Sequence, residues 1–192
     1  MPPKPKLNVH SFPRPPLLEK TSRHLLVKWA DGTVIAETRE GYWVLETTHP
    51  PTYYLPPTSL QTPTTLTQST KRTLCEWKGA AIYWNITPPT TPTTSPTPTS
   101  TPISSTTSLP KQVTNRIWSY ESPTKPFAPI KGYLSFYAGP WDCFVDGEKV
   151  AAQPGDFYGG WVTSEIEGRV KGARGLGVVM GLGEVGLSGE SV

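Results

Sequence analysis

The sequence predicts a mainly β protein: a single small antiparallel domain, built as an open barrel or a tent-like sandwich. Strand-like runs of aromatic and β-branched residues recur along the chain between turn residues. Two Asp-Gly pairs, Asp31-Gly32 and Asp146-Gly147, each separate two such runs, which is the strongest short-range hairpin signal. No segment combines a sustained helical apolar period with caps, so we expect at most one short helix, near residues 58–60.

The first third of the chain reads as an arm followed by short strands. Residues 1–19 hold many prolines and no periodicity, so we expect an extended proline-rich arm there. Residues 24–29 and 33–38 form the first predicted hairpin, and residues 42–46 form a third strand. The prolines of residues 49–57 cannot donate to a sheet ladder, which predicts an edge strand or an extended crossing.

A segment rich in Thr, Pro and Ser interrupts the middle of the chain. It separates residues 74–86, the longest β-like run, from a further strand candidate at residues 116–120. Of the 24 residues from 87 to 110, 22 are Thr, Pro or Ser. Such a segment buries too little to offset its ordering entropy, so we predict a disordered loop at residues 87–112. We interpret it as an enlarged hairpin loop; a linker between two domains would leave halves of only about 75 ordered residues.

The remaining strands complete the predicted domain. Residues 131–138 form a strand, and residues 142–145 and 148–150 flank the second Asp-Gly turn. We therefore expect one β domain over residues 20–172. Residues 173–192 are rich in glycine and have few side chains that could pack, which predicts a poorly ordered tail.

Composition excludes several classes of protein. The net charge of +3 is spread along the 192 residues, whereas nucleic-acid binding needs a concentrated basic face. No apolar run reaches the roughly 20 residues that span a bilayer, and the start lacks the apolar core of a secretion signal. We therefore expect an intracellular protein with no membrane partner. Two cysteines cannot build a disulfide framework or a four-thiolate zinc site.

One phrase occurs twice: Lys-Gly, three residues, then two aromatic residues. It stands at Lys78-Gly79 and again at Lys131-Gly132. A lysine beside a glycine can present a point charge where a phosphate or carboxylate approaches the backbone. The alternative is that both are ordinary lysines at strand starts.

Cys75 and Glu46 are the candidate catalytic residues. Lys78 lies three residues after Cys75, and a nearby ammonium favours a thiolate. On a regular strand this offset places the two side chains on opposite faces, so they meet only if the chain turns at Trp77. The alternative for Cys75 is a small core residue. Glu46 follows apolar neighbours, so it must be paired or face a cavity. His49 could act as a base, although no pattern places it near Cys75.

The sequence also offers stacking, anion and metal candidates. Tyr and Trp carry polar tips, so a cluster of them can line a pocket for a planar ligand, although ordinary core packing accounts for most. The candidates for such a pocket include Tyr54, Tyr83, Trp118 and Tyr120. Arg169, Lys171 and Arg174 among glycines could form an anion-binding turn. Asp142, Asp146 and Glu148 are spaced like metal carboxylates, but Asp146 suits the hairpin turn, so we predict no metal site.

The order of several motifs is similar to that of a known family. They are residues 19–38, 44–57, 75–83, 118–120, 130–137 and 157–161. Over residues 19–172 this succession resembles the family called domain of unknown function 427, and Tyr158-Gly159-Gly160-Trp161 looks like its fungal branch. The resemblance implies a small antiparallel β domain with no settled activity, filed under a nucleotidyltransferase-type label. The chain lacks the Gly-Ser and paired aspartates of familiar nucleotidyltransferases, and its Thr/Pro/Ser insertion replaces a short turn.

Our first functional hypothesis is a module that binds a small anionic, nucleotide-like ligand in a pocket between the two Lys-Gly strands. Its predicted ligand-binding residues are Glu46, Tyr54, Lys78, Tyr83, Trp118, Tyr120 and Lys131. The lysines would neutralise charge, Tyr83 and Trp118 would stack, and Glu46 would accept a hydrogen bond. The second hypothesis is an enzyme of unknown reaction that uses Cys75 or Glu46. The third is an interaction protein whose arm and loop recruit partners. The sequence indicates no cofactor.

Overall fold

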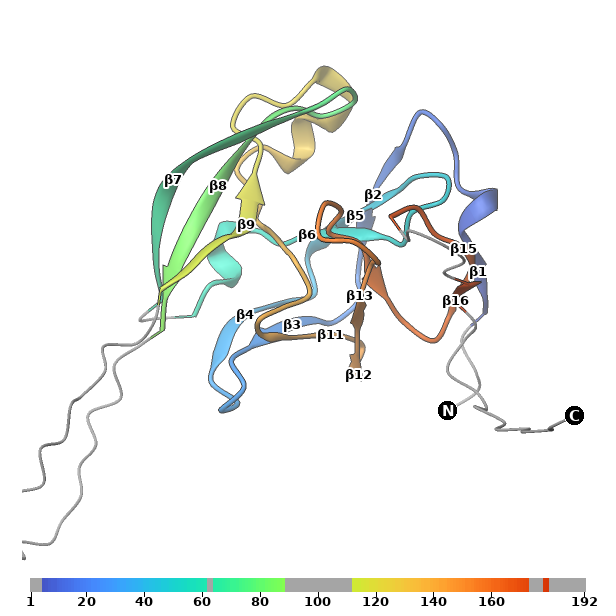
Figure 1. The fold of residues 1–192 in the computed structure, drawn as a ribbon. Coiled ribbons are helices and arrows are strands. Elements are labelled where there is room, and N and C mark those ends of the chain that lie inside the picture. The colour runs from blue at the N-terminus through green and yellow to red at the C-terminus, as the bar shows by residue number, and fades with distance from the viewer. Residues whose placement is uncertain (1–4, 62–63, 89–111, 173–177, 180–192) are drawn as a thin grey trace, which may run out of the picture.

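Short antiparallel sheets make up most of the structure. The computed structural model describes residues 5–61, 64–88, 112–172 and 178–179, in which strands alternate with three short 3-10 turns and no α-helix occurs. The sheets remain open and splay apart, as Figure 1 shows. The mainly β prediction is therefore confirmed. Most of the predicted loop at 87–112 and of the tail at 173–192 lies outside the described residues.

The first sheet is built around the first predicted hairpin. Its order is β12-β11-β3-β4, formed by β3 (Leu25–Lys28), β4 (Val34–Thr38), β11 (Asp142–Val145) and β12 (Glu148–Lys149). Both Asp-Gly turns occur where the sequence predicts them, because β3 pairs with β4 and β11 pairs with β12 in antiparallel fashion. β11 then pairs with β3, which brings the two hairpins into one sheet.

A second sheet lies in the middle of the molecule. It has the order β2-β5-β6, formed by β2 (Leu17–Thr21), β5 (Gly41–Leu45) and β6 (Thr52–Tyr54). β6 carries the proline-flanked residues and occupies the edge of this sheet, as predicted. The turn between β5 and β6 holds Glu46 and His49, where the backbone amide of His49 donates to the carbonyl of Glu46 at 2.9 Å.

The third sheet forms one side of the molecule, next to the second (Figure 1). Its order is β10-β9-β8-β7, formed by β7 (Thr65–Cys75), β8 (Gly79–Thr87), β9 (Val113–Ser119) and β10 (Ser135–Phe136). The curved strands β7 and β8 lie at its outside (Figure 1). β8 and β9 pair in antiparallel fashion, so the segment between them joins neighbouring strands of one sheet. The strand predicted over 131–138 is shorter, because the 3-10 turn η3 (Lys125–Ile130) precedes it and only Ser135–Phe136 pairs.

The remaining elements are short, and most of them lie on the side of the molecule away from β7 and β8 (Figure 1). They are β1 (Leu7–Asn8), η1 (Val9–Ser11), η2 (Pro57–Ser59), β13 (Ala151–Ala152), β14 (Trp161–Val162), β15 (Ile166–Arg169) and β16 (Val178–Val179). β1 pairs with β15 in parallel, and β16 extends the same sheet. η2 covers the position of the predicted short helix. Among the described residues, no helix has the length and hydrophobicity that crossing a bilayer requires.

The proline-rich segment before β2 packs against the body from residue 7 onward. Val9 is fully buried, and its carbonyl accepts from the amide of Thr48 at 2.9 Å. Arg23, just after β2, pairs with Glu165, whose side chain is almost fully buried, and donates from Nη2 to Oε2 at 3.0 Å. Because a buried carboxylate needs a partner, this ion pair ties the start of the domain to the segment before β15.

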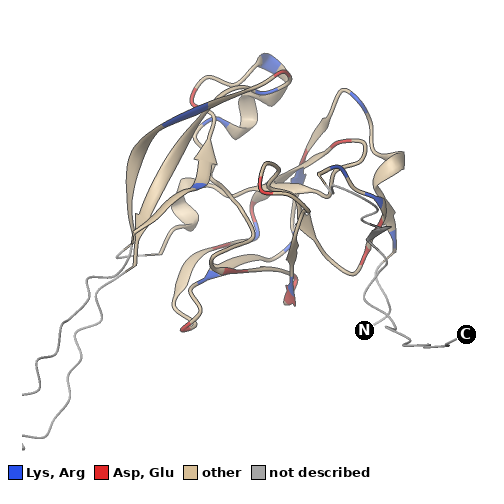
Figure 2. Cartoon of the chain, in the orientation of Figure 1, with Lys and Arg blue, Asp and Glu red and all other residues tan. Residues whose placement is uncertain are grey.

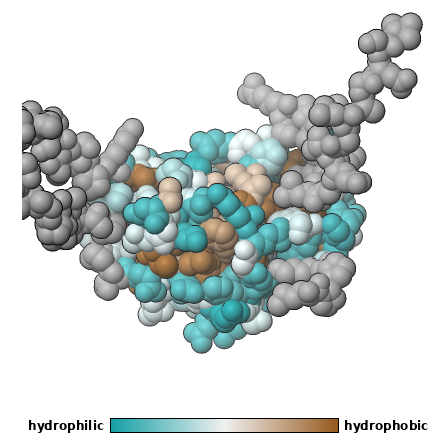
Figure 3. Space-filling model, turned by 90° about the horizontal axis from the view of Figure 1, so that it is seen from below, coloured by the Kyte–Doolittle hydropathy of each residue, from teal (hydrophilic) through white to brown (hydrophobic). Residues whose placement is uncertain are grey.

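Two apolar clusters form most of the core. One surrounds Leu25, Ile35, Phe136 and Trp161, and it joins the first sheet to the third. The other consists of Val44, Tyr54, Ala81, Tyr83, Trp118, Tyr120, Phe127, Ile130 and Tyr137; we call it the aromatic cluster. On the face shown in Figure 3, apolar surface lies in patches between hydrophilic residues.

Replacing Gly159 with alanine is expected to destabilise the fold. A Cβ at this position would lie 2.1 Å from Cη2 of Trp118, so the indole must move. Overpacking of this kind costs about 1–3 kcal/mol, which differential scanning calorimetry would detect as a lower melting temperature. Trp118→Phe removes the clashing atoms, so it should cost less in the Gly159→Ala background than in the wild type. Additive losses would contradict this packing.

Candidate functional site

The chain reverses direction between β7 and β8, at residues 76–78. Cys75 pairs with Gly79 across the turn, and Gly79, the first residue of β8, has a φ of +97°, a left-handed value that favours glycine. Thr124 fixes the loop, because its amide donates to the carbonyl of Lys78 at 3.2 Å. The continuous strand predicted over 74–86 is therefore wrong. The sequence predicts that the side chains of Cys75 and Lys78 meet only if the chain turns at Trp77, and the structure has this turn.

Lys78 is buried, with only 9% of its surface exposed. Burial alone lowers the pKa of Lys78, but the nearby Tyr54, Cys75 and Glu46 outweigh burial and raise this pKa, so the ammonium stays charged. Its Nζ lies 5.7 Å from the centre of the Phe127 ring. Among the described residues, no salt bridge joins Lys78 to a carboxylate.

Two further donors near Lys78 in the sequence or the fold lack well-formed hydrogen bonds. The hydroxyl of Tyr54 is buried, and no hydrogen bond of ordinary geometry reaches it within the described part of the chain, although Tyr120 and Trp118 lie near enough to influence its pKa. Burial raises the pKa of Tyr54, so the hydroxyl keeps its proton. The indole Nε1 of Trp77, which packs against the aromatic cluster, is also buried without a partner there. An unsatisfied buried donor costs about 1–3 kcal/mol, so the pair is an unusual feature of this core.

The other predicted stacking residues belong to the aromatic cluster. Tyr83 shares a hydrogen bond of 3.1 Å with Thr73, and Trp118 packs against Tyr137 with 4.8 Å between ring centres. Tyr120 is buried, and burial together with Tyr54 raises its pKa far above the usual value. These three rings therefore pack within the aromatic cluster. Lys131 lies apart: it is exposed at the end of η3, although its backbone bridges to that of Tyr120.

Glu46 lies at the outer edge of the cluster, with 16% of its side chain exposed. Its Oε1 lies 3.7 Å from Nη1 of Arg14, and Nη2 of Arg14 donates to Glu76 at 2.8 Å. The Arg14 guanidinium also lies 5.6 Å from the centre of the Trp77 ring. The proline-rich segment thus covers the turn that carries Lys78. Sequence reasoning missed Arg14, although a lone arginine between Pro13 and Pro15 was a visible signal.

His49 lies in the same neighbourhood. Burial lowers its pKa, an effect that Glu46 opposes and the charge of Lys78 supports, so the ring is neutral near pH 7. Its Nδ1 donates to the carbonyl of Thr47 at 3.0 Å, which leaves Nε2 as the unprotonated nitrogen. Among the described residues, no hydrogen bond joins His49 to Cys75. The structure places Glu46, His49 and Cys75 near Lys78. It does not pair His49 with Cys75 as base and nucleophile within the described residues.

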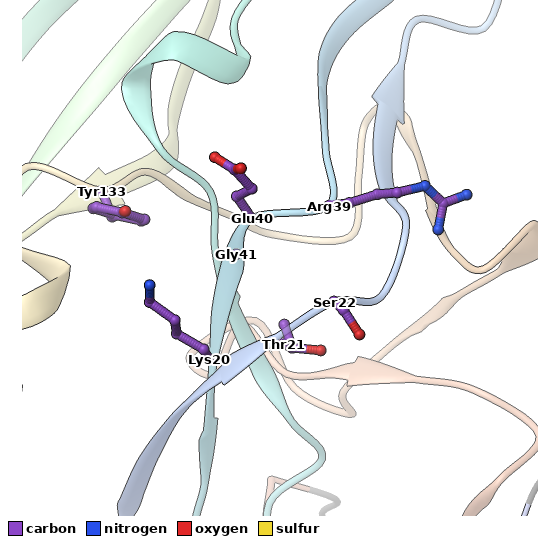
Figure 4. A pocket seen from close by; sticks show the side chains of 7 residues that line it. All are labelled: Lys20, Thr21, Ser22, Arg39, Glu40, Gly41 and Tyr133. Atoms are coloured by element: carbon purple, nitrogen blue, oxygen red, sulfur yellow. The ribbon is translucent and has the colours of Figure 1, made fainter.

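Hollows at the surface are lined by other residues. One of about 460 Å³ lies between the end of β2 and the turn from β4 to β5, lined by Lys20, Thr21, Ser22, Arg39, Glu40, Gly41 and Tyr133. Lys20, Glu40 and Tyr133 lie around one side of it, whereas Arg39 extends the other way (Figure 4). Another of about 310 Å³ lies beside the turn after β5. Neither hollow includes a residue predicted for the pocket between the Lys-Gly strands. Arg169 and Lys171 of the predicted anion-binding turn line the second hollow, and Arg174 lies outside the described residues.

The acidic side chains of the described residues form no metal centre. Lys and Arg are scattered along the described chain (Figure 2). Asp142 pairs with Lys149 at 2.7 Å, and Asp146 accepts from the amide of His24 at 2.8 Å. Within the described ranges, no three His, Cys, Asp or Glu side chains are grouped as metal ligands.

Comparison with known proteins places the chain in a family. A family model described as Domain of unknown function (DUF427) matches residues 17–149, which is more than half of the chain. The match covers all the strands that surround Lys78, from β2 to β9. No curated protein matches the sequence.

The two cysteines provide a test of the turn geometry. Cys75 is half-buried beside Lys78, whereas Cys143 is buried in the core, where burial raises the pKa of its thiol far above the usual value. Iodoacetamide at neutral pH should therefore alkylate Cys75 in the folded protein and reach Cys143 only after unfolding. Peptide mass spectrometry over time distinguishes the two sites. Equal labelling of both cysteines in the native protein would contradict the structure.

Proposed function

The chain belongs to the Domain of unknown function (DUF427) family, and we propose that it binds a small anionic ligand through Lys78. One observation carries the proposal: a buried ammonium, which forms no salt bridge within the described part of the chain, stands near the buried Tyr54 hydroxyl and next in sequence to Trp77. Tyr54 Oη and Trp77 Nε1 have no hydrogen-bond partner of ordinary geometry among the described residues. A phosphate or carboxylate group supplies what these donors lack, namely negative charge and several acceptor oxygens.

Energetics support a role in binding. A buried charge costs several kcal/mol in desolvation, and well-packed apolar residues often replace such groups without loss of stability. Lys78 stands among Tyr54, Phe127 and the rest of the aromatic cluster, where an apolar side chain of its size would pack at lower cost. Groups that reduce stability in this way are typical of functional sites.

The neighbouring rings favour a planar ligand such as a nucleotide. Trp77 is half-buried and lies beneath the guanidinium of Arg14, so it offers ring surface at the edge of the cluster. A ligand with its acidic group on Lys78 and its planar part near Trp77 would also meet Arg14. In this arrangement Trp118 and Tyr83 support the site from within. Lys131 takes no part, because it is exposed at the end of η3.

A second candidate function is thiol chemistry at Cys75. The feature that favours it is that Cys75 lies close enough to Lys78 to help raise the pKa of its ammonium. An ammonium in this position stabilises a thiolate, the form of cysteine that attacks electrophiles. His49 is neutral and near Lys78, which supplies a base in the same neighbourhood. Glu46 is engaged with Arg14 and therefore serves better as a positioning group.

Thermal shift measurements test the binding proposal. Adenosine monophosphate should raise the melting temperature of the wild type by several degrees, because saturating ligand adds about 2.7 kcal/mol at 100 times its Kd. Lys78→Met should remain folded, with equal or higher intrinsic stability, and lose most of this shift. Lys131→Met, which removes the other Lys-Gly lysine, should keep it.

Two results would contradict the proposal. One is a wild-type melting temperature that does not respond to adenosine monophosphate, a sugar phosphate or inorganic phosphate. The other is a shift of equal size in Lys78→Met and the wild type. Adenosine without phosphate is the control for stacking alone, and it should produce a much smaller shift, because it offers no charge to Lys78.

A further inference from the structure

The smaller of the two surface hollows lies beside the turn that carries His49, because Thr48 of this turn lines it. It has a volume of about 310 Å³ and is lined by His10, Thr48, Arg169, Val170, Lys171 and Gly172. These residues come from η1, from the turn after β5 and from the end of β15, so segments far apart in sequence form its walls. It shares no residue with the Lys78 site.

The lining of this hollow is basic. Arg169, Lys171 and His10 all carry nitrogen donors, and no carboxylate lines it. Neither Arg169 nor Lys171 forms a salt bridge with any described residue. Lys171 Nζ lies 5.4 Å from the centre of the Tyr158 ring, which holds it beside the hollow. Positive groups held together without an acidic partner favour an anion.

The backbone around the hollow is held in an uncommon conformation. Thr48 has a φ of +66°, which is a rare and costly value for a β-branched residue. Hydrogen bonds hold it there, because its amide donates to Val9 at 2.9 Å and its carbonyl accepts from Lys171 at 2.8 Å. Gly172 has a φ of +107°, and a Cβ there would lie 2.1 Å from the carbonyl oxygen of Pro154. Strain of this kind clusters at ligand sites.

His10 is fixed as a donor at the rim. Its Nε2 accepts from the amide of Arg169 at 3.1 Å, so in the neutral ring the proton lies on Nδ1. Its own amide donates to the side chain of Asn8 at 2.9 Å. Its ring also lies against Gly168, where a Cβ would come within 2.8 Å of it. The imidazole is therefore positioned from two sides.

We propose that this hollow is a second anion site, which binds the phosphate group of a small phosphomonoester through Arg169, Lys171 and His10. The volume exceeds that of a bare phosphate and lies at the small end of ligand pockets, so a small organic group is accommodated with the phosphate. His49 follows Thr48 in the chain and its ring packs on Tyr158, over which Lys171 lies. An anion bound in the hollow should therefore change the electrostatic environment of the His49 ring as well.

The three histidines report on this site by NMR. In the Lys78→Met variant, which lacks the other proposed anion site, inorganic phosphate titrated against sodium chloride of equal ionic strength should shift the imidazole signals of His10 and His49 with one common Kd. His24 pairs with Glu37 at 2.6 Å and does not line the hollow, so its signal should stay in place. The double variant Arg169→Gln/Lys171→Gln should bind phosphate about tenfold more weakly or worse.

A matched variant controls for total charge. Lys20→Gln/Arg39→Gln removes two positive charges from the larger hollow and should leave the phosphate affinity unchanged. Lys78→Met should also retain the His10 shift, which separates this site from the proposed function. The inference is overturned if all three histidines shift equally, if both double variants weaken binding alike, or if Lys78→Met abolishes the His10 response. Preference for vesicles of phosphatidic acid over inorganic phosphate would overturn the small-molecule source.

Discussion

The burial of the Lys78 ammonium is the constraint on which the arrangement of this site depends. A charge inside a protein must be compensated, and here the compensation comes from several strands at once. β6 supplies Tyr54, the end of β5 supplies Glu46, and the end of β7 supplies Cys75. These strands belong to two different sheets, so the third sheet must lie next to the second for Lys78 to remain charged in its position.

The turn after β5 connects the two proposed anion sites. Glu46 and His49 interact with Lys78 on one side, whereas Thr48 lines the basic hollow on the other. Both ends of the described chain hold this turn in place, because Val9 accepts from Thr48 and Lys171 donates to it. Residues outside the 17–149 family match therefore shape the candidate site.

Local signals in the sequence predicted the hairpins well. The Asp-Gly turns depend on the conformational preferences of two adjacent residues, so they appear as expected in the β3–β4 and β11–β12 hairpins. The turn at residues 76–78 lacks such a pair, and its only signal is Gly79, which closes the loop at positive φ. The β-like run at residues 74–86 therefore contains the turn of the β7–β8 hairpin, which its composition does not indicate. The same turn brings Cys75 to Lys78, which the sequence presented only as a conditional outcome.

Long-range features were beyond the reach of sequence patterns. The contact of Arg14 with Glu46 and Glu76 joins residues far apart in the chain, and no periodicity encodes it. The two Lys-Gly phrases look equivalent in sequence, yet one lysine is the last residue of the tight turn between β7 and β8 and is buried, while the other follows the proline-containing η3 and is exposed. Their difference arises from tertiary packing.

A crystal structure with adenosine monophosphate tests the central claim most directly. We predict phosphate oxygens within hydrogen-bond distance of Lys78 Nζ and Tyr54 Oη, with the purine near Trp77. Ligand bound elsewhere, with Lys78 Nζ and Tyr54 Oη both hydrogen-bonded to protein groups, would contradict it.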